Sequence, residues 1–139
     1  MVDKNIDNAY SNSSGKSPNG EGTGNTSWYN EDGSINYPPN DGAVPGSEKT
    51  VTLNTGESVG RYGGIGENSK FVTQSGASSD SLSLPPNTDP STYQNIKILK
   101  PIEGVTQSIV APWGDSSGGG LQYVLPKPIQ WYIINGYME

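Results

Sequence analysis

Glycine and proline constrain this chain more than any other feature, because 19 glycines and 11 prolines occur in 139 residues. Both residue types interrupt regular structure, so a chain in which they recur this often is built from short elements. Short elements favour strands and turns over a helix bundle. We therefore expect an α+β fold that is mainly β, with a small mixed or antiparallel sheet, short helical turns and a C-terminal helix.

The expected strands follow from alternation and from short apolar runs. Val51 and Leu53 alternate with polar residues, which is the two-residue period of a half-buried strand. Further strands are expected over residues 59–62, 70–73, 95–99, 106–111 and 121–125. Residues 82–86 are expected to be extended, since a residue before proline is kept out of the helical region.

Helical signals are few. Asp89 followed by Pro90 has the pattern of a capped helical turn. Near the C-terminus, Ile129, Tyr132 and Ile133 have the spacing of one helix face, and Gly136 is placed to end that helix. We expect the apolar face of this helix to pack on the sheet.

Composition divides the chain into two parts. Residues 12–26 contain no large apolar side chain, so this stretch buries too little surface to offset the cost of ordering it. We expect residues 1–36 to form a flexible tail or linker, with Trp28 and Tyr29 as a short arm that docks on the domain. The globular domain is expected over residues 37–139.

Several classes of site and partner are disfavoured by composition. The chain has no cysteine and no histidine, which removes disulfides, thiolate zinc sites and the commonest general base. A net charge of −6 argues against nucleic-acid binding. No apolar stretch is long enough to span a bilayer, and no secretory signal is evident in this sequence. Localisation stays open, and export as part of a larger effector is one alternative.

Arg61 is the only arginine, and it precedes a glycine cluster that includes Gly63. A guanidinium is permanently charged and binds phosphate bidentately, while glycines allow a ligand to approach the backbone closely. This favours a phosphate-binding site at Arg61. The alternative is an ordinary arginine that pairs with Glu67 or Asp80.

Several stretches, taken in order, resemble the tuberculosis-necrotizing-toxin-like domain family of NAD glycohydrolases. The matching stretches are Tyr37-Pro38-Pro39-Asn40-Asp41-Gly42, Arg61-Tyr62-Gly63-Gly64, Ser83-Leu84-Pro85-Pro86, Tyr93 with Leu99-Lys100-Pro101, Ala111-Pro112-Trp113, Gly118-Gly119-Gly120-Leu121-Gln122-Tyr123 and Asn135-Gly136-Tyr137-Met138-Glu139. Each is weak alone, but their order and spacing over residues 37–139 are specific. The resemblance implies a small, mostly β domain that cleaves NAD between ribose and nicotinamide.

The resemblance also implies site residues. The family's essential arginine and glutamine fall on Arg61 and Gln122. We expect Arg61 to hold the diphosphate, and the Gln122 amide to face the ribose with an acceptor and two donors. Both are expected to be required for turnover. The further substrate-binding candidates are Tyr62, Gly63, Phe71, Trp113, Asp115, Gly119 and Gly120.

These candidates have ordinary structural alternatives. Most aromatic residues in a small β domain are core residues, so two of Tyr62, Phe71 and Trp113 are expected to be structural. Asp115 contacts a ribose hydroxyl or caps a turn, and the glycines approach a ligand or connect a hairpin. Trp131 and Tyr132 are expected to pack.

The chain departs from the family at four positions, which are Ala43, Phe71, Leu82 and Gln94. These changes leave three functions open. The first is hydrolysis of NAD or NADP to nicotinamide and ADP-ribose, as a toxin or effector module. The second is cyclisation to cyclic ADP-ribose on the same scaffold, and the third is a binding module with a degraded site.

The expected partners follow from this reading. NAD or NADP is the substrate, and no additional cofactor and no metal are expected, since no dense acidic loop appears in the sequence. A protein inhibitor is expected if the chain is a toxin. No nucleic acid or membrane partner is expected.

Overall fold

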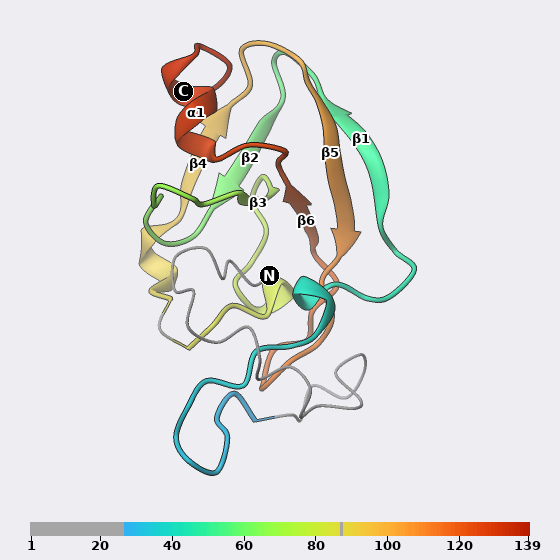
Figure 1. Cartoon of the computed structure of the whole chain (residues 1–139), viewed down its shortest axis with the longest axis vertical. Coiled ribbons are helices and arrows are strands. Elements are labelled where there is room, and N and C mark those ends of the chain that lie inside the picture. The colour runs from blue at the N-terminus through green and yellow to red at the C-terminus, as the bar shows by residue number, and fades with distance from the viewer. Residues whose placement is uncertain (1–26, 87) are drawn as a thin grey trace.

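One antiparallel sheet organises the molecule, with strand order β1-β5-β6-β3-β2-β4 (Figure 1). The computed structural model describes residues 27–86 and 88–139. The strands are β1 (Lys49–Leu53), β2 (Ser58–Arg61), β3 (Phe71–Gln74), β4 (Gln94–Lys97), β5 (Ile102–Ile109) and β6 (Leu121–Val124). The helical elements are η2 (Asn40–Gly42), η3 (Asp80–Leu82), η4 (Pro90–Thr92) and α1 (Ile129–Ile134). This confirms the predicted α+β, mainly β class.

The larger hydrophobic core lies on one face of the sheet, which we call the helix face because α1 packs against it. Val59, Val72 and Val105 project to this face from three strands and are fully buried. Ile129 and Tyr132 of α1 belong to the same cluster. The predicted packing of the C-terminal helix on the sheet is therefore confirmed.

The chain ends against an edge of the sheet. Gly136 has a φ of +79° and closes α1, with Tyr137 N–H donating to the Tyr132 carbonyl at 2.8 Å. The C-terminal residues then pair with the outer edge of β4, where Lys97 and Glu139 exchange two backbone hydrogen bonds.

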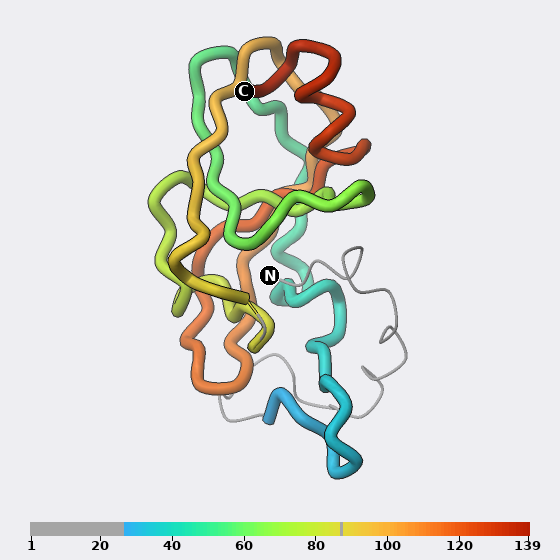
Figure 2. The backbone as a smooth tube through the Cα atoms, turned by 90° about the vertical axis from the view of Figure 1, so that its left-hand side faces the viewer, coloured from blue at the N-terminus to red at the C-terminus, as the bar shows by residue number. Residues whose placement is uncertain are grey.

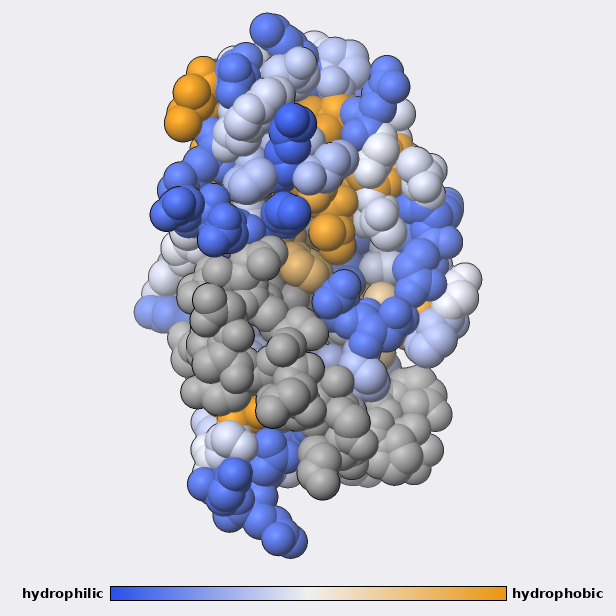
Figure 3. Space-filling model, in the orientation of Figure 1, coloured by the Kyte–Doolittle hydropathy of each residue, from blue (hydrophilic) through white to orange (hydrophobic). Residues whose placement is uncertain are grey.

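Figure 3 shows hydrophobic surface over α1, where Ile134 is 81% exposed. In the described part of the chain, no helix is long and apolar enough to cross a membrane.

A smaller cluster covers the opposite face, which we call the Gln122 face. Alternation along the strands sends Phe71 and Thr73 of β3, and Gln122 and Val124 of β6, to this side. Phe71 packs there with Leu82 and Val110, and Tyr62 and Val124 border them. This face therefore combines a small apolar cluster with a buried polar side chain on the central strand β6.

Residues 27–36 form an arm at the opposite end of the molecule from α1 (Figure 2). Tyr29 and Ile35 make an isolated antiparallel bridge, and the Trp28 ring packs edge-on against Tyr37 and Trp113. The predicted docking of Trp28 agrees with these ring contacts, and Trp113 Nε1 adds a hydrogen bond to the Asn36 carbonyl. Residues 1–26 of the predicted tail lie outside the described residues.

One segment has a backbone that the sequence did not predict. Residues 82–86 were expected to be extended, but Leu82 closes the turn of η3 and Ser83 has a left-handed backbone, with φ +49° and ψ +54°. The Ser83 hydroxyl donates to the Ala111 carbonyl at 2.6 Å, and this long-range contact holds the unusual conformation. The predicted turn at Pro90 is present, and Asp89 accepts a hydrogen bond from Ser91 N–H at 2.9 Å.

Candidate active site

A row of buried polar side chains crosses the centre of the Gln122 face. Strand register places Ser108 of β5, Gln122 of β6 and Thr73 of β3 side by side. All three are buried, and Gln122 is only 1% exposed. Buried polar groups are costly unless hydrogen-bonded, so each of them requires a partner or a function. The Thr73 hydroxyl has such a partner, since it donates to the Leu121 carbonyl at 2.8 Å.

The Gln122 amide is held at one end only. Its Nε2 donates to the backbone carbonyl of Asp41 at 3.2 Å. Its Oε1 is buried and finds no hydrogen-bond partner among residues 27–86 and 88–139. An unsatisfied buried acceptor costs about 1–3 kcal/mol, so its retention calls for an explanation. Gln122 therefore places an unsatisfied acceptor at the centre of the Gln122 face.

The carbonyl that holds Gln122 belongs to a left-handed turn. Asn40, Asp41 and Gly42 have φ values of +58°, +55° and +81°. The Gly42 carbonyl accepts from Ala111 N–H at 2.8 Å, and the Asn40 side chain donates to Glu48 at 2.8 Å. The Asn40 contact holds the pKa of the Glu48 carboxyl below its ordinary value. The turn is therefore fastened to the domain on both sides.

Backbone strain is concentrated around this turn. In the described part of the chain, only Asn40, Asp41 and Ser83 are non-glycine residues with positive φ. Ala111 links them, since its N–H donates to Gly42 and its carbonyl accepts from Ser83. Strained residues persist where the surrounding structure holds them, and they gather at functional sites. The sequence offered a signal for this turn in Asn-Asp-Gly, whose residues tolerate a left-handed backbone.

Aromatic side chains flank the polar row on the same face. Phe71 is a diagonal neighbour of Gln122 across the β3–β6 pair. Tyr62 and Tyr93 pack with ring centroids 4.9 Å apart, and the Tyr62 hydroxyl donates to the Ala77 carbonyl. Burial, together with the nearby Tyr93, raises the pKa of the Tyr62 hydroxyl. The structure thus brings Tyr62, Phe71 and Gln122 to one face, and it adds Tyr93, which the sequence did not assign to the site.

Tyr93 lies where a glycine leaves room for it. A Cβ atom on Gly60 would come within 2.6 Å of the Tyr93 ring. Gly60 pairs with Thr73, so the ring covers the same face as the polar row. The signal in the sequence was a glycine within a strand, which often marks the close approach of another group.

Arg61 takes a different position. The residue next to it, Gly60, lies opposite Thr73, so strand alternation directs the Arg61 side chain away from the Gln122 face. The side chain is 1% exposed, and its guanidinium donates to the Phe71 carbonyl at 3.0 Å and to the Gly64 carbonyl at 2.7 Å. These contacts join β2 to the loop that leads into β3. The guanidinium is thus buried and bound to two backbone carbonyls.

Trp113 is a packing residue in this arrangement. Its ring is fully buried, lies edge-on to Trp28 and donates from Nε1 to the Asn36 carbonyl at 2.9 Å. This differs from the predicted stacking of Trp113 on a substrate, because the ring faces the arm. Trp28 also explains Gly114, where a Cβ would lie 2.5 Å from the indole.

The glycine positions differ from one another. Gly63 has a φ of +83°, and its N–H donates to the Thr92 hydroxyl at 2.7 Å. A Cβ on Gly120 would lie 2.8 Å from the Ser81 hydroxyl, so this glycine serves backbone packing. Gly119 has open space around it. Gly119 therefore leaves room for a ligand, and so does Gly63, where a Cβ would meet only the Thr88 methyl at 3.9 Å.

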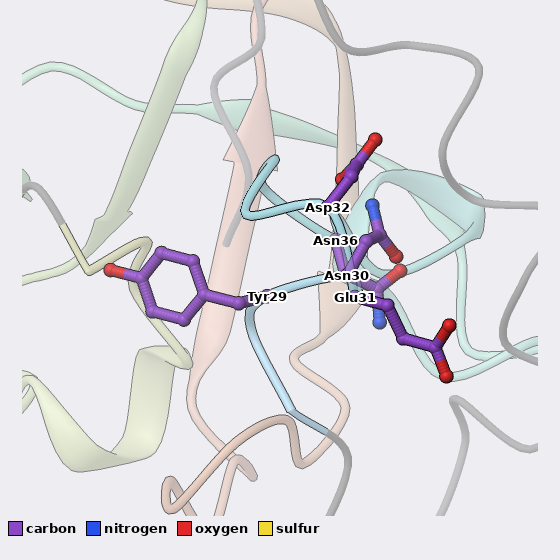
Figure 4. Close-up of a pocket in the computed structure, with 5 residues that line it drawn as sticks. All are labelled: Tyr29, Asn30, Glu31, Asp32 and Asn36. Atoms are coloured by element: carbon purple, nitrogen blue, oxygen red, sulfur yellow. The ribbon is translucent and has the colours of Figure 1, made fainter.

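Two depressions open on the surface near these loops. Asp115 is exposed and borders one of about 290 Å³, together with Asp80 and Leu84. The other, of about 570 Å³, is lined by the arm residues Tyr29, Asn30, Glu31, Asp32 and Asn36. In the second, the Tyr29 ring points away from the other four side chains (Figure 4). Both carry carboxylates, which repel the phosphates of a dinucleotide.

Three positions that depart from the family lie on the Gln122 face, and Phe71 is one of them. Leu82 is fully buried against Phe71 and Val110, and Ala43 is buried and bridges Val110. Gln94 is exposed on β4. Within residues 27–86 and 88–139, no three acidic side chains gather closely enough to hold a metal ion.

Comparison with known proteins identifies the relatives of this fold. The sequence model of the family described as tuberculosis necrotizing toxin matches residues 52–139. Among solved structures, the chain is similar to tuberculosis necrotizing toxin complexed with its immunity factor, with a TM-score of 0.57 and 23% identity. The match covers 77% of this chain and 62% of that chain, so it spans less than two thirds of the solved protein. No curated protein sequence matched.

Proposed function

Because the chain belongs to the tuberculosis necrotizing toxin family, we propose that it cleaves the bond between ribose and nicotinamide in NAD or NADP. The products are nicotinamide and ADP-ribose, or its 2′-phosphate from NADP. The observation that carries this proposal is the buried Oε1 of Gln122, an acceptor without a partner among the described residues. The substrate identity comes from the family resemblance.

The proposed reaction suits a chain that lacks histidine. As the C1′–N bond breaks, its electron pair passes to the pyridinium nitrogen, so nicotinamide leaves as a neutral molecule and needs no proton. The ribosyl centre that remains is positively charged, as in other glycosyl cleavages. Water then forms the new C1′–O bond and loses a proton to solvent.

Gln122 supplies the electrostatic part of this proposal. A carbonyl oxygen that is already desolvated and fixed in place stabilises a developing positive charge without reorganising at the moment of reaction. The same oxygen can instead accept a hydrogen bond from a ribose hydroxyl, which positions the sugar. In both cases, the amide must keep its oxygen directed away from Asp41.

Arg61 enters the proposal through the loop that it holds. Its contact with the Phe71 carbonyl fixes a residue whose ring lies beside Gln122. The expected direct grip on the diphosphate would require the guanidinium to leave the Phe71 and Gly64 carbonyls. We therefore propose that Arg61 supports activity chiefly by fixing this loop.

A toxin role is part of the same proposal. The solved relative is in complex with its immunity factor, and a toxin module of this chain would equally require a protein inhibitor in the cell that makes it.

Product identification tests the proposed reaction. The purified chain is incubated separately with NAD and NADP, and the products are separated by chromatography and identified by mass spectrometry. Equal amounts of nicotinamide and ADP-ribose from NAD support hydrolysis. Nicotinamide together with cyclic ADP-ribose identifies a cyclase, and binding of NAD without turnover by the folded protein identifies a binding module.

A further inference from the structure

We propose that Asp41 is a positioning residue, whose backbone carbonyl orients the Gln122 amide through the left-handed turn Asn40–Gly42. This inference rests on the proposed function, because it says how the acceptor oxygen of that site is presented. The inference gives a reason for the left-handed backbone of the Asn-Asp-Gly turn, which lines neither of the surface depressions described above.

Donor and acceptor chemistry fixes the direction of the amide. A backbone carbonyl only accepts hydrogen bonds, so the end of Gln122 that faces Asp41 must be the NH₂ group. The Oε1 atom then occupies the opposite end, where it is buried without a partner among the described residues. If the Asp41 carbonyl were turned away, the amide could rotate and present its donors instead.

The left-handed backbone is what points this carbonyl at Gln122. Three successive residues have positive φ, and glycine, asparagine and aspartate are the residue types that adopt this conformation most readily. Contacts at both ends oppose relaxation of the turn, through Ala111 N–H on Gly42 and through Glu48 on Asn40. The residue types of the turn and the contacts at its two ends therefore both keep the Asp41 carbonyl directed at Gln122.

Three substitutions at Asp41 separate the backbone role from a role of the carboxylate. Asp41→Val disfavours the left-handed conformation, since β-branched residues rarely adopt it. We expect kcat to fall by about 100-fold with a smaller change in KM, because a displaced catalytic group slows the reaction more than it weakens binding. Asp41→Gly and Asp41→Asn are expected to retain most of the wild-type activity, because both residue types adopt the left-handed backbone readily. Asp32→Val, in the arm, is the matched control.

Two outcomes of this series overturn the inference. Full activity in Asp41→Val shows that the turn does not control the site. Equal loss in Asp41→Gly, Asp41→Asn and Asp41→Val shows that the carboxylate itself is required. Circular dichroism on each variant separates loss of folding from loss of activity.

Side-chain amide exchange, measured by NMR, tests the geometry without relying on turnover. In the wild-type protein, the Nε2 protons of Gln122 should exchange with solvent more slowly than those of the exposed Gln94, and this protection should fall in Asp41→Val. Equally fast exchange of Gln122 and Gln94 in the wild type would overturn the inference, even if Asp41→Val does not fold. If Gln122 is protected but the protein leaves NAD intact, the proposed function is wrong, while the contact that orients Gln122 is supported.

Discussion

At the scale of single residues, three adjacent glycines that resemble a ligand loop have different tasks. A Cβ on Gly118 would lie 2.6 Å from the Val110 carbonyl oxygen, and a Cβ on Gly120 would lie 2.8 Å from the Ser81 hydroxyl. Nothing lies within 4 Å of the corresponding position on Gly119. Close packing of backbone therefore explains two of the three glycines.

Alanine substitutions separate these tasks. Gly118→Ala and Gly120→Ala should each destabilise the protein by about 2–3 kcal/mol, because neighbouring backbone has to move. Gly119→Ala should cost about 1–2 kcal/mol, since its φ of +93° is unfavourable for alanine although space is free. Urea unfolding measures all three, and a Gly118→Ala protein as stable as wild type would contradict the packing account.

Arg61 shows how burial changes an expectation drawn from sequence. Its loss was expected to remove activity alone, but the structure makes it a buried donor to Phe71 and Gly64. Arg61→Ala removes a buried hydrogen bond to Phe71 and a half-buried one to Gly64, so we expect a loss of about 2–4 kcal/mol in the free energy of unfolding. Arg61→Lys should be less damaging than Arg61→Ala, because an ammonium group can still donate to some of these acceptors. Undiminished stability of Arg61→Ala in urea would count against this role.

At the scale of elements, the Trp28 ring and the hydrogen bond from Trp113 to the Asn36 carbonyl tie the arm to the domain. Trp28 contacts Tyr37 and Trp113, while Tyr29 is exposed. Trp28→Ala should therefore lower the free energy of unfolding by about 2 kcal/mol, by removing half-buried aromatic surface. Tyr29→Ala is the matched control and should change it by less than about 0.5 kcal/mol. Equal effects of the two substitutions on thermal unfolding would show that the arm does not dock as described.

Local patterns predicted the elements better than their arrangement. Two signals that depend only on neighbouring residues predicted their elements. The alternation of Val51 and Leu53 predicted β1, and Gly136 predicted the end of α1. The left-handed backbone of Ser83 depends on Ala111, which lies far along the chain. Contacts of this kind leave no periodic signal, so the sequence predicted an extended segment there instead.

At the scale of the whole molecule, strand register decides which side chains share a face of the sheet. Gly60, Thr73 and Gln122 align across β2, β3 and β6, so Arg61 starts on the other side of the sheet from Gln122. Composition drew attention to Arg61, and the family resemblance implied Gln122. A shift of one residue in strand pairing would have placed the two side chains on the same face. The sheet thus separates a structural arginine from a glutamine that faces the proposed ribose site.

The release of nicotinamide from NAD by Gln122→Ala tests the central claim most directly. Gln107→Ala is the matched control, because Gln107 lies on the adjacent strand β5 opposite Tyr123 and so points to the helix face. With both variants folded, we predict that Gln122→Ala lowers kcat by about 100-fold or more, as loss of one preorganised electrostatic group does. Gln107→Ala should retain the wild-type rate. A folded Gln122→Ala protein that releases nicotinamide as fast as wild type would contradict the account.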